Sequence, residues 1–477
     1  MECGKSAGSW RIFWIGFLAA SVYFAGTLYW VVTVVSTFGG LGWGVAGAVG
    51  LLMVATQAIY PALFAVLLGR AVRRFGVAGV WLAPFLWVAT EWLRATTAFA
   101  FPWVLLGTSQ ARVLPLVQAA SVAGVYGLSW IVALMGSAAA AVTLSRQRRH
   151  AWGAAASIVF LVGLAVAGTV RANGSALTRQ GTPLRVGIVQ GNIEQDVKWN
   201  ASFQQPIVAR HIDLSRQALA LKSDVILWPE SSSPFYFDNE PVLAAPVRRL
   251  AAQAGIPFIL GTDEFERTPA GDRFYNVAVQ LGPEGKSVGR YRKMQLVPFG
   301  EYVPLKRLFF FAGHLVEAVS DFSPGTEPRV FDLGGSRRMS VAICYESVNP
   351  WLGRAFVQRG SQLLGIITND AWFGRSSAAY QHFDQGAIRA VEEGRYVVRA
   401  ANTGISGVVD PYGRVVTETG LFQATAFAAD VRLLDDVTIY QRTGDLIVWF
   451  SLLVSAAIFV QSARWRVREG AAPRLNS

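Results

Sequence analysis

Three residues in the second half of the chain have side chains that could together carry acyl chemistry: Glu230, Lys293 and Cys344. A cysteine attacks a carbonyl as its thiolate, so an attacking thiol needs a base or a cation close to it. A glutamate can take the thiol proton, and a lysine can stabilise the oxyanion that forms on the attacked carbonyl. These residue types are therefore suited to the transfer of an acyl group through a thioester.

Each of the three also has an ordinary structural interpretation. Cys344 follows the apolar stretch Val341–Ile343, and such a cysteine is commonly part of a buried core. Glu230 follows a Trp-Pro pair and could be a structural carboxylate, while Lys293 could lie in a solvated basic loop. Residue type alone leaves both interpretations open at each position.

The candidate residues stand where predicted strands end. Two strand–helix–strand units are predicted: Leu184–Gln190, Phe203–Leu221 and Asp224–Trp228, then Met339–Ile343, Trp351–Arg359 and Leu363–Thr368. This order predicts an α/β sheet domain, and active sites gather at the carboxyl ends of such strands. The polar residues at those ends are Glu230, then Cys344, Tyr345 and Glu346, then Asn369 and Asp370.

The rest of the chain is unusually apolar. Charged residues make up 16% of the sequence, against about 25% in ordinary soluble domains. Six runs are long or apolar enough to be candidate membrane spans, at roughly 20 residues per crossing. They are Ile12–Val35, Gly44–Leu68, Val77–Leu93, Leu116–Leu144, Trp152–Val170 and Leu446–Val460. The sequence therefore predicts a multi-span α-helical membrane domain.

Basic residues in the short connections predict the orientation. Four clusters fall on one face if every run crosses once: Lys5 and Arg11; Arg70, Arg73 and Arg74; Arg146, Arg148 and Arg149; Arg464, Arg466 and Arg468. That face is predicted to be cytoplasmic, which places the long central segment outside. The net charge of +12 is then explained by topology, and no nucleic-acid partner is expected.

These patterns divide the chain into five parts. Residues 1–170 are predicted to form the membrane domain with about five spans, and 171–182 a polar linker. Residues 183–442 are predicted to form the extracytoplasmic catalytic domain. A C-terminal transmembrane helix, 443–463, and a basic cytoplasmic tail, 464–477, complete the chain.

Other motifs carry weaker signals. Gly42–Gly47 matches GxGxxG, but in a membrane segment the pattern favours close helix packing over dinucleotide binding. Glu91 and Arg94 are either a functional pair or an interfacial pair that ends a helix. The two cysteines are far apart in sequence, and the four histidines lack HExxH spacing, so neither a disulfide framework nor a metal site is expected.

Several stretches together resemble the nitrilase superfamily. They are Trp228-Pro229-Glu230, Arg292-Lys293 through Pro298-Phe299-Gly300-Glu301, Cys344-Tyr345-Glu346, Asn369 to Phe373, and Arg399 through Asn402-Thr403-Gly404. Further features narrow the resemblance to the apolipoprotein N-acyltransferase family. These are the membrane spans on both sides of the central domain and three stretches: Val189 to Ile193, Lys198-Trp199 and Phe101-Pro102-Trp103. The likeness extends over nearly the whole chain.

The resemblance implies an α/β nitrilase-like α-β-β-α sandwich with a catalytic triad of Glu230, Lys293 and Cys344. It implies that an acyl chain passes from a membrane phospholipid to Cys344, and then to the α-amino group of a diacylglyceryl-cysteine at an apolipoprotein N-terminus. Supporting roles would fall to Glu301, Tyr345, Glu346 and Trp199, without metal or organic cofactor. The implied location is the bacterial inner membrane, with the catalytic domain on the periplasmic face.

Two features depart from the family pattern. The family usually has eight spans, so either the first two are absent here or the true start lies further upstream. Gln295 stands where a histidine is common after the lysine motif, which leaves the role of this side chain open.

Two rival functions use the same sequence features. A membrane-anchored amidase would use the same triad with water as the acceptor, although one span would suffice as its anchor. A transporter or scaffold is disfavoured, because the membrane half carries few charges and the triad is complete. Separately, Leu308–Phe311, preceded by Lys306 and Arg307, is either core or an arm that dips into the outer leaflet.

Overall fold

The computed structural model describes residues 8–40, 42–97, 101–198, 200–269, 271–298, 300–302 and 322–470, with side chains described up to residue 461. Contacts divide this part of the chain into two compact units. One contains residues 8–32, 44–173 and 442–470, and the other contains 33–40, 42–43 and the described residues of 174–441. Trp199 and the Leu308–Phe311 segment lie outside the described residues, so the predictions made for them stay predictions.

The first unit is helical, and a helix occupies each predicted span. Its elements are α1 (Ser9–Thr27), the first residues of α2 (Trp30–Thr37), α3 (Trp43–Phe75), η1 (Gly76–Leu82), α4 (Ala83–Thr96), η2 (Leu106–Gln110), α5 (Leu114–Val117), α6 (Ala120–Leu144), α7 (Arg148–Gly174) and α14 (Leu446–Gly470). The part of α2 from Thr33 onward is grouped with the second unit. Among the described residues, the stretches Trp43–Thr96, Ala120–Leu144 and Arg148–Thr178 are long and apolar enough to cross a membrane. The number of crossings stays a prediction, because α1 and α2 pass this test only as a pair bent by 58°, and the apolar part of α14 is shorter.

The stretch Trp43–Thr96 contains both the second and the third predicted span. Its 54 residues would extend about 80 Å as one straight helix, far beyond a hydrocarbon core of about 30 Å. The 3-10 segment η1 interrupts it, beginning at Gly76 with a φ of +63°. Large apolar side chains such as Leu51, Val159 and Leu453 remain exposed on these helices, as expected for surfaces that face lipid.

The structure answers the question about Glu91 and Arg94. Both are buried on α4, and both bond to backbone groups between Phe101 and Leu106, the residue that opens η2. Glu91 Oε1 accepts the N–H of Leu106 at 2.6 Å. The Arg94 guanidinium donates to the carbonyls of Phe101 and Trp103, each at 2.9 Å, and of Val104 at 3.4 Å. These contacts favour the structural interpretation, since each side chain provides a hydrogen-bond partner for backbone N–H or C=O groups that are not paired within a helix.

The interpretation of Gly42–Gly47 as a helix-packing motif is wrong for the described residues. A Cβ added to Gly44 or Gly47 would meet no atom within 4 Å. The close approach lies one turn later, where a Cβ on Gly50 would be 2.6 Å from Cγ2 of Val32. The segment also follows a helix, α2, rather than a strand, so the context that dinucleotide binding requires is missing here.

The second unit contains two sheets. One has the order β13-β1-β2-β4-β5-β6, with β3 paired to β4, and the other has the order β12-β11-β10-β9-β8-β7. The first sheet's strands are β1 (Thr182–Gln190), β2 (Val225–Leu227), β3 (Ser233–Tyr236), β4 (Phe258–Thr268), β5 (Gly271–Leu281), β6 (Ser287–Arg292) and β13 (Thr425–Leu433). Those of the second are β7 (Phe331–Asp332), β8 (Arg338–Ile343), β9 (Leu363–Thr368), β10 (Val397–Ala401), β11 (Gly407–Val409) and β12 (Val415–Glu418).

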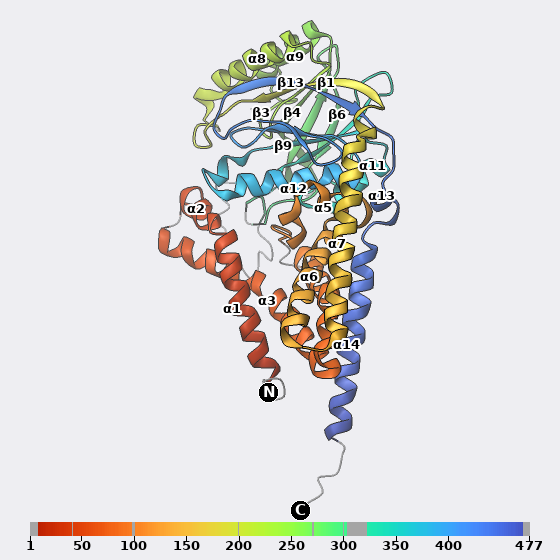
Figure 1. Cartoon of the computed structure of the whole chain (residues 1–477). Helices are drawn as coiled ribbons and strands as arrows, with labels where there is room; N and C mark the ends of the chain where they lie inside the picture. The colour runs from red at the N-terminus through yellow and green to blue at the C-terminus, as the bar shows by residue number, and fades with distance from the viewer. Residues whose placement is uncertain are drawn as a thin grey trace, which may run out of the picture. The chain divides into compact units, whose positions relative to one another are not determined.

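Helices cover the outer face of each sheet, so the unit is an α-β-β-α sandwich. Figure 1 shows α8 (Gln204–Ala220) and α9 (Pro241–Ala254) beside the first sheet, and α12 (Ser377–Glu393) beside the second. The helix α11 (Pro350–Gln358) contributes to the same core as the second sheet. The predicted fold class, a helical membrane domain with an α/β sandwich, is confirmed.

Alternation along the strands explains the layers. In and after β2, Val225 and Leu227 belong to the core shared with the second sheet, whereas Ile226 and Trp228 pack with α8 and α9. Successive side chains on a strand point to opposite faces, so an uninterrupted apolar run suits a strand that is covered on both sides.

The parallel strands determine where the polar residues meet. In the second sheet β8 pairs with β9 and β9 with β10, all parallel, and in the first sheet β1 pairs with β2 and β2 with β4 in the same manner. Parallel neighbours end on the same edge of a sheet. Glu230, Cys344 and Asn369 therefore follow strands that end at these edges.

Candidate active site

Cys344 follows directly on β8 and opens the 3-10 turn η6 (Cys344–Val348). Its φ is +52°, a left-handed conformation that L-residues other than glycine, asparagine and aspartate rarely adopt. Such strain persists only where the surroundings hold it, and it is concentrated at functional sites. The side chain is buried, as the structural interpretation of Cys344 expects, but its backbone is not that of an ordinary core residue.

Glu230 lies two residues beyond Trp228 and has hydrogen-bond donors at both carboxylate oxygens. Oε1 accepts from Asn276 Nδ2 at 2.7 Å and from Lys293 Nζ at 3.2 Å, and Oε2 accepts the N–H of Asn369 at 2.8 Å. Burial alone would raise its pKa, but the Lys293 and Lys198 cations and the hydrogen bonds from Asn276 and Lys293 outweigh burial and hold the pKa below the usual range. Glu230 is therefore ionised and able to accept a proton.

Lys293 follows β6 and is 1% exposed. Its Nζ lies between two carboxylates, 3.2 Å from Oε1 of Glu230 and 2.8 Å from Oε1 of Glu301. Burial would lower the pKa of Lys293, but the two carboxylates raise it well above its ordinary value. The interpretation of Lys293 as a solvated basic loop residue is wrong, because this side chain is a buried cation held by two acids.

Glu301 is part of the same cluster. Its Oε1 accepts from Asn276 Nδ2 at 3.0 Å as well as from Lys293, and its Oε2 accepts the N–H of Val297 at 2.8 Å. Glu301 thus holds the lysine together with Glu230 and anchors the turn that follows Lys293.

The electrostatics of Cys344 favour a protonated thiol in the resting state. Burial raises its pKa, the charge of Glu230 raises it further, and the Lys293 cation and a hydrogen bond with Thr368 oppose both effects. A thiol in this state does not attack by itself, so proton removal has to accompany the attack. The structure brings Glu230, Lys293 and Cys344 into one buried cluster, in which a carboxylate and an ammonium group both act electrostatically on the thiol.

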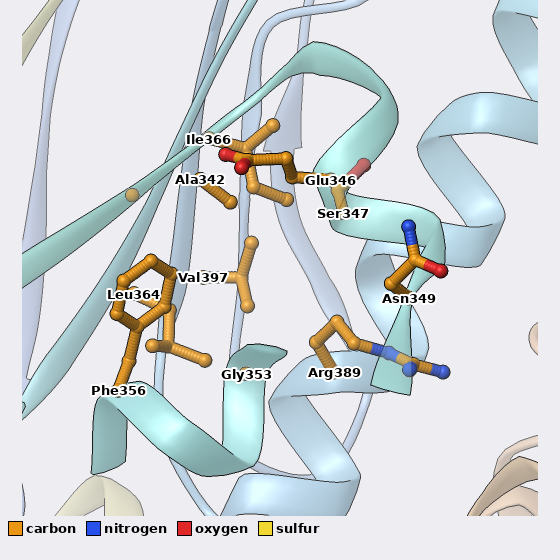
Figure 2. A pocket seen from close by; sticks show the side chains of 11 residues that line it. Ala342, Glu346, Ser347, Asn349, Gly353, Phe356, Leu364, Ile366, Arg389 and Val397 are labelled. Atoms are coloured by element: carbon orange, nitrogen blue, oxygen red, sulfur yellow. The ribbon is translucent and has the colours of Figure 1, made fainter. Parts of the chain in front are cut away.

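Glu346 connects the lysine segment to the cysteine turn. Its Oε1 accepts from the hydroxyl of Tyr291 and the N–H of Met294, each at 2.7 Å, and from the N–H of Gln295 at 3.1 Å. Its Oε2 accepts the N–H of Ile343 at 2.8 Å. Figure 2 shows the side chain extending from its 3-10 turn toward the strands that carry Ala342 and Ile366. Burial raises the pKa of Glu346 to about 7 against the effect of these bonds.

The remaining predicted supporting residues have different outcomes. Tyr345 is buried beside Cys344, and Trp199 lies outside the described residues. Gln295 contributes its backbone N–H to Glu346, and the role of its side chain stays open. Figure 2 also shows the small cavity beneath this turn, of about 20 Å³, lined mainly by apolar groups of the second sheet and α11.

Three further residues hold Glu230, and no role was predicted for them from the sequence, although Asn369 and Lys198 lie in quoted motifs. Asn276, on β5, bonds both Glu230 and Glu301, and Asn369 gives Glu230 its backbone N–H. Lys198 is buried and donates to the carbonyl of Glu230 at 3.2 Å. Burial lowers the pKa of Lys198 to about 8 against the attraction of Glu230. Lys198 stood in a quoted motif beside Trp199, so a signal existed for it, whereas nothing in the sequence singled out Asn276.

Comparisons with known proteins agree with this architecture. The family model described as carbon-nitrogen hydrolase matches residues 185–435, and the model described as apolipoprotein N-acyltransferase N-terminal domain matches residues 2–138. A protein of Geobacter metallireducens named apolipoprotein N-acyltransferase is 40% identical over 467 residues, which cover 96% of this chain and 88% of that protein. One of the same name from Pseudomonas aeruginosa is 34% identical over 446 residues, covering 92% and 84%.

Among solved structures, an amidase from Nesterenkonia sp. is similar to part of this chain. It is 22% identical, with a TM-score of 0.41, and the match covers 56% of this chain and 96% of the amidase.

Proposed function

The chain belongs to the apolipoprotein N-acyltransferase family, as the sequence motifs predicted, and from this premise we propose that it acylates lipoprotein N-termini by a two-step mechanism through Cys344. The donor is a membrane phospholipid. The acceptor is the α-amino group of the diacylglyceryl-cysteine that begins an apolipoprotein.

In the first step the sulfur of Cys344 attacks an ester carbonyl of the phospholipid while Glu230 takes the thiol proton. Lys293 stabilises the negative charge on the carbonyl oxygen. The intermediate then expels the lysophospholipid oxygen, which receives the proton from Glu230, and leaves the acyl chain as a thioester on Cys344.

In the second step the free amine attacks the thioester. Glu230 takes a proton from the attacking nitrogen and returns it to the departing sulfur, so the amide forms and the thiol is restored. The resting state supports this cycle, since Glu230 is held ionised and Lys293 is held charged in the same buried cluster as the thiol.

The observation that carries the proposal is the contact of Lys293 Nζ with both Glu230 and Glu301, at 3.2 and 2.8 Å, beside the strained Cys344. A purely structural ion pair would need one carboxylate. Because Glu301 also contacts the lysine, Lys293 can stay charged when Glu230 accepts the thiol proton.

Cys344→Ala tests the proposal directly. We expect no thioester and no transfer, while the variant folds, because exchanging a thiol for hydrogen changes little volume. Purified protein is incubated with phospholipid and analysed by mass spectrometry for an acyl adduct, and lipoprotein N-termini are analysed for the third acyl chain. Substantial turnover by Cys344→Ala would contradict the thioester route.

The same assay separates transfer from hydrolysis. Transfer yields a lysophospholipid and an N-acylated peptide in equal amounts, whereas the rival amidase-type reaction would release free fatty acid to water. Accumulation of fatty acid in place of the N-acylated peptide would favour the hydrolase.

The proposed location is the bacterial inner membrane, with residues 183–442 on the periplasmic face and the termini in the cytoplasm. The arginine clusters support this orientation. A cysteine placed at Ser175 should react with an impermeant thiol reagent from outside, and one placed at Gln147 should not. The reverse pattern would overturn the orientation.

A further inference from the structure

A chain of buried polar side chains lies behind the cysteine turn and takes no part in the steps above. It consists of His382 on α12, Asp370 after β9 and Arg399 on β10, each at most 4% exposed. His382 Nδ1 lies 2.9 Å from Oδ1 of Asp370, and Arg399 Nη2 donates to Oδ2 of Asp370 at 2.8 Å. Arg399 Nη2 also lies 3.0 Å from His382 Nδ1.

The other end of this chain reaches the nucleophile's own backbone. His382 Nε2 lies 3.0 Å from the carbonyl oxygen of Cys344 and 3.1 Å from Oγ of Ser347. The Ser347 hydroxyl donates to the same carbonyl at 2.9 Å. Two side chains from different elements therefore converge on a single peptide oxygen.

The partners determine which ring nitrogen of His382 carries a proton. A backbone carbonyl can only accept, so the contact of Nε2 with Cys344 requires a proton on Nε2. At Nδ1 the two partners differ: the Asp370 carboxylate can only accept and is satisfied by a proton, whereas the Arg399 guanidinium can only donate and is satisfied by a lone pair. Burial lowers the pKa of His382 and the Arg399 cation lowers it further, against the attraction of Asp370. Nε2 carries its proton in both the neutral and the charged ring, so the bond to Cys344 holds in either state.

The bond restrains a peptide group that is under strain. Cys344 has a positive φ, so the orientation of the Cys344–Tyr345 peptide has to be held by its surroundings. The described peptide bonds are all trans, so the N–H of Tyr345 points opposite to the carbonyl that His382 holds. A backbone N–H directly after a nucleophile is a common oxyanion donor, and its direction therefore matters to catalysis.

We propose that His382, oriented by Asp370 and Arg399, is a positioning residue that fixes the Cys344–Tyr345 peptide so that its N–H can assist Lys293 at the oxyanion. His382 touches neither substrate nor sulfur in this proposal and acts through the backbone of the nucleophile. The inference rests on the proposed function, because it assigns His382 to the oxyanion step of thioester formation.

The test compares His382→Gln with His382→Asn in the purified full-length enzyme. The glutamine amide nitrogen can stand near the place of Nε2 and donate to the Cys344 carbonyl, whereas the asparagine amide falls near the place of Nδ1. His382→Leu removes the donor entirely. His211→Gln is the matched control, since His211 is the buried histidine of α8 that packs on Trp228 and bonds the carbonyl of Ile207.

Two rates are measured at neutral pH. The first is acyl-enzyme formation from phospholipid in a single turnover, which needs an oxyanion site. The second is alkylation of Cys344 by iodoacetamide, which forms no oxyanion and reports on the thiol and its base. Thermal unfolding of each variant checks the fold.

We expect acylation to fall about 100-fold in His382→Asn and His382→Leu, the usual effect of losing one oxyanion donor. His382→Gln should stay within about tenfold of the wild type, and alkylation should change by no more than about threefold in all variants. The His211→Gln control should keep both rates.

Three results would overturn the positioning role: wild-type acylation by His382→Leu, equal losses in the glutamine and asparagine variants, or parallel losses of acylation and alkylation. If His382→Leu does not fold, the glutamine–asparagine pair still decides. Failure of the proposed function is recognised separately, because the wild-type enzyme would then form no acyl-enzyme on Cys344 at all.

Discussion

The helical unit and the sandwich unit each bury a glutamate beside a basic residue, and they use the pair in different ways. Arg94 bonds to backbone carbonyls of the segment that follows α4, and Glu91 bonds to the N–H of Leu106 and the indole N–H of Trp87. Glu230 and Lys293 bond to each other and to further side chains, Asn276 and Glu301. The first pair satisfies an irregular stretch of chain, whereas the second concentrates charge next to a thiol.

The difference shows why a buried charge by itself does not mark a catalytic site. A charged side chain whose hydrogen bonds go to backbone groups stabilises the fold, and it is not placed to exchange protons with a substrate. In the proposed mechanism, a lysine with two carboxylates beside a protonated thiol provides both a base and an oxyanion donor. Substituting the two glutamates alike therefore provides the sharpest test of the comparison.

The largest effect is expected from Glu230→Gln. An amide cannot take the thiol proton, so acyl-enzyme formation should fall by about 1,000-fold or more. Single-turnover acylation followed by mass spectrometry of Cys344 measures this. Glu264→Gln is the control, because Glu264 forms partly exposed ion pairs with Arg290 and Arg292, which contribute little. Thioester formation by Glu230→Gln at the control's rate would refute the assignment of the base.

A smaller effect concerns stability in acid and the buried histidine of α8. Burial lowers the pKa of His211 from 6.5 to about 4. Between pH 4 and pH 6.5, His211 is therefore mostly protonated in the unfolded chain and mostly neutral in the folded chain. The free energy of unfolding is therefore unaffected by protonation of His211 above pH 6.5. It falls by up to roughly 3 kcal/mol as the pH decreases toward 4, because protonation stabilises the unfolded chain. His211→Gln should flatten this part of the curve in thermal unfolding experiments at stepped pH. An unchanged acid dependence in the variant would assign the effect to other groups.

The smallest effect is expected from Glu91→Gln. The glutamine oxygen can still accept the N–H of Leu106, so the free energy of unfolding should fall by only about 1 kcal/mol. Single-turnover acylation in detergent should stay within about twofold of the wild type. Glu91→Leu, which leaves that N–H without its acceptor, should cost more stability but still spare acylation. A loss of acylation comparable with that of Glu230→Gln would show that Glu91 has a catalytic role and would remove the distinction between the units.

Much of this protein can be predicted from local sequence. The apolar runs locate the helices of the first unit, because covering the polar backbone in lipid demands long apolar helices. The β-branched stretches around Ile188, Val341 and Ile366 locate strands that are buried on both faces. Glu230, Lys293 and Cys344 can be proposed as site residues from the sequence because each stands in a recognisable motif close after a strand.

Other features depend on tertiary structure because they are formed by residues far apart in the chain. Asn276 reaches Glu230 only after β5 has paired with β4. The carbonyl of Cys344 meets His382, which lies on a helix and 38 residues later in the sequence, and Glu91 meets the N–H of Leu106, 15 residues later. Hydrogen bonds require partners within about 3 Å in a suitable direction, and no spacing in the sequence specifies that. The amino-acid sequence thus determined which groups could react, and the packing of the two sheets decided their charge states, partners and orientation.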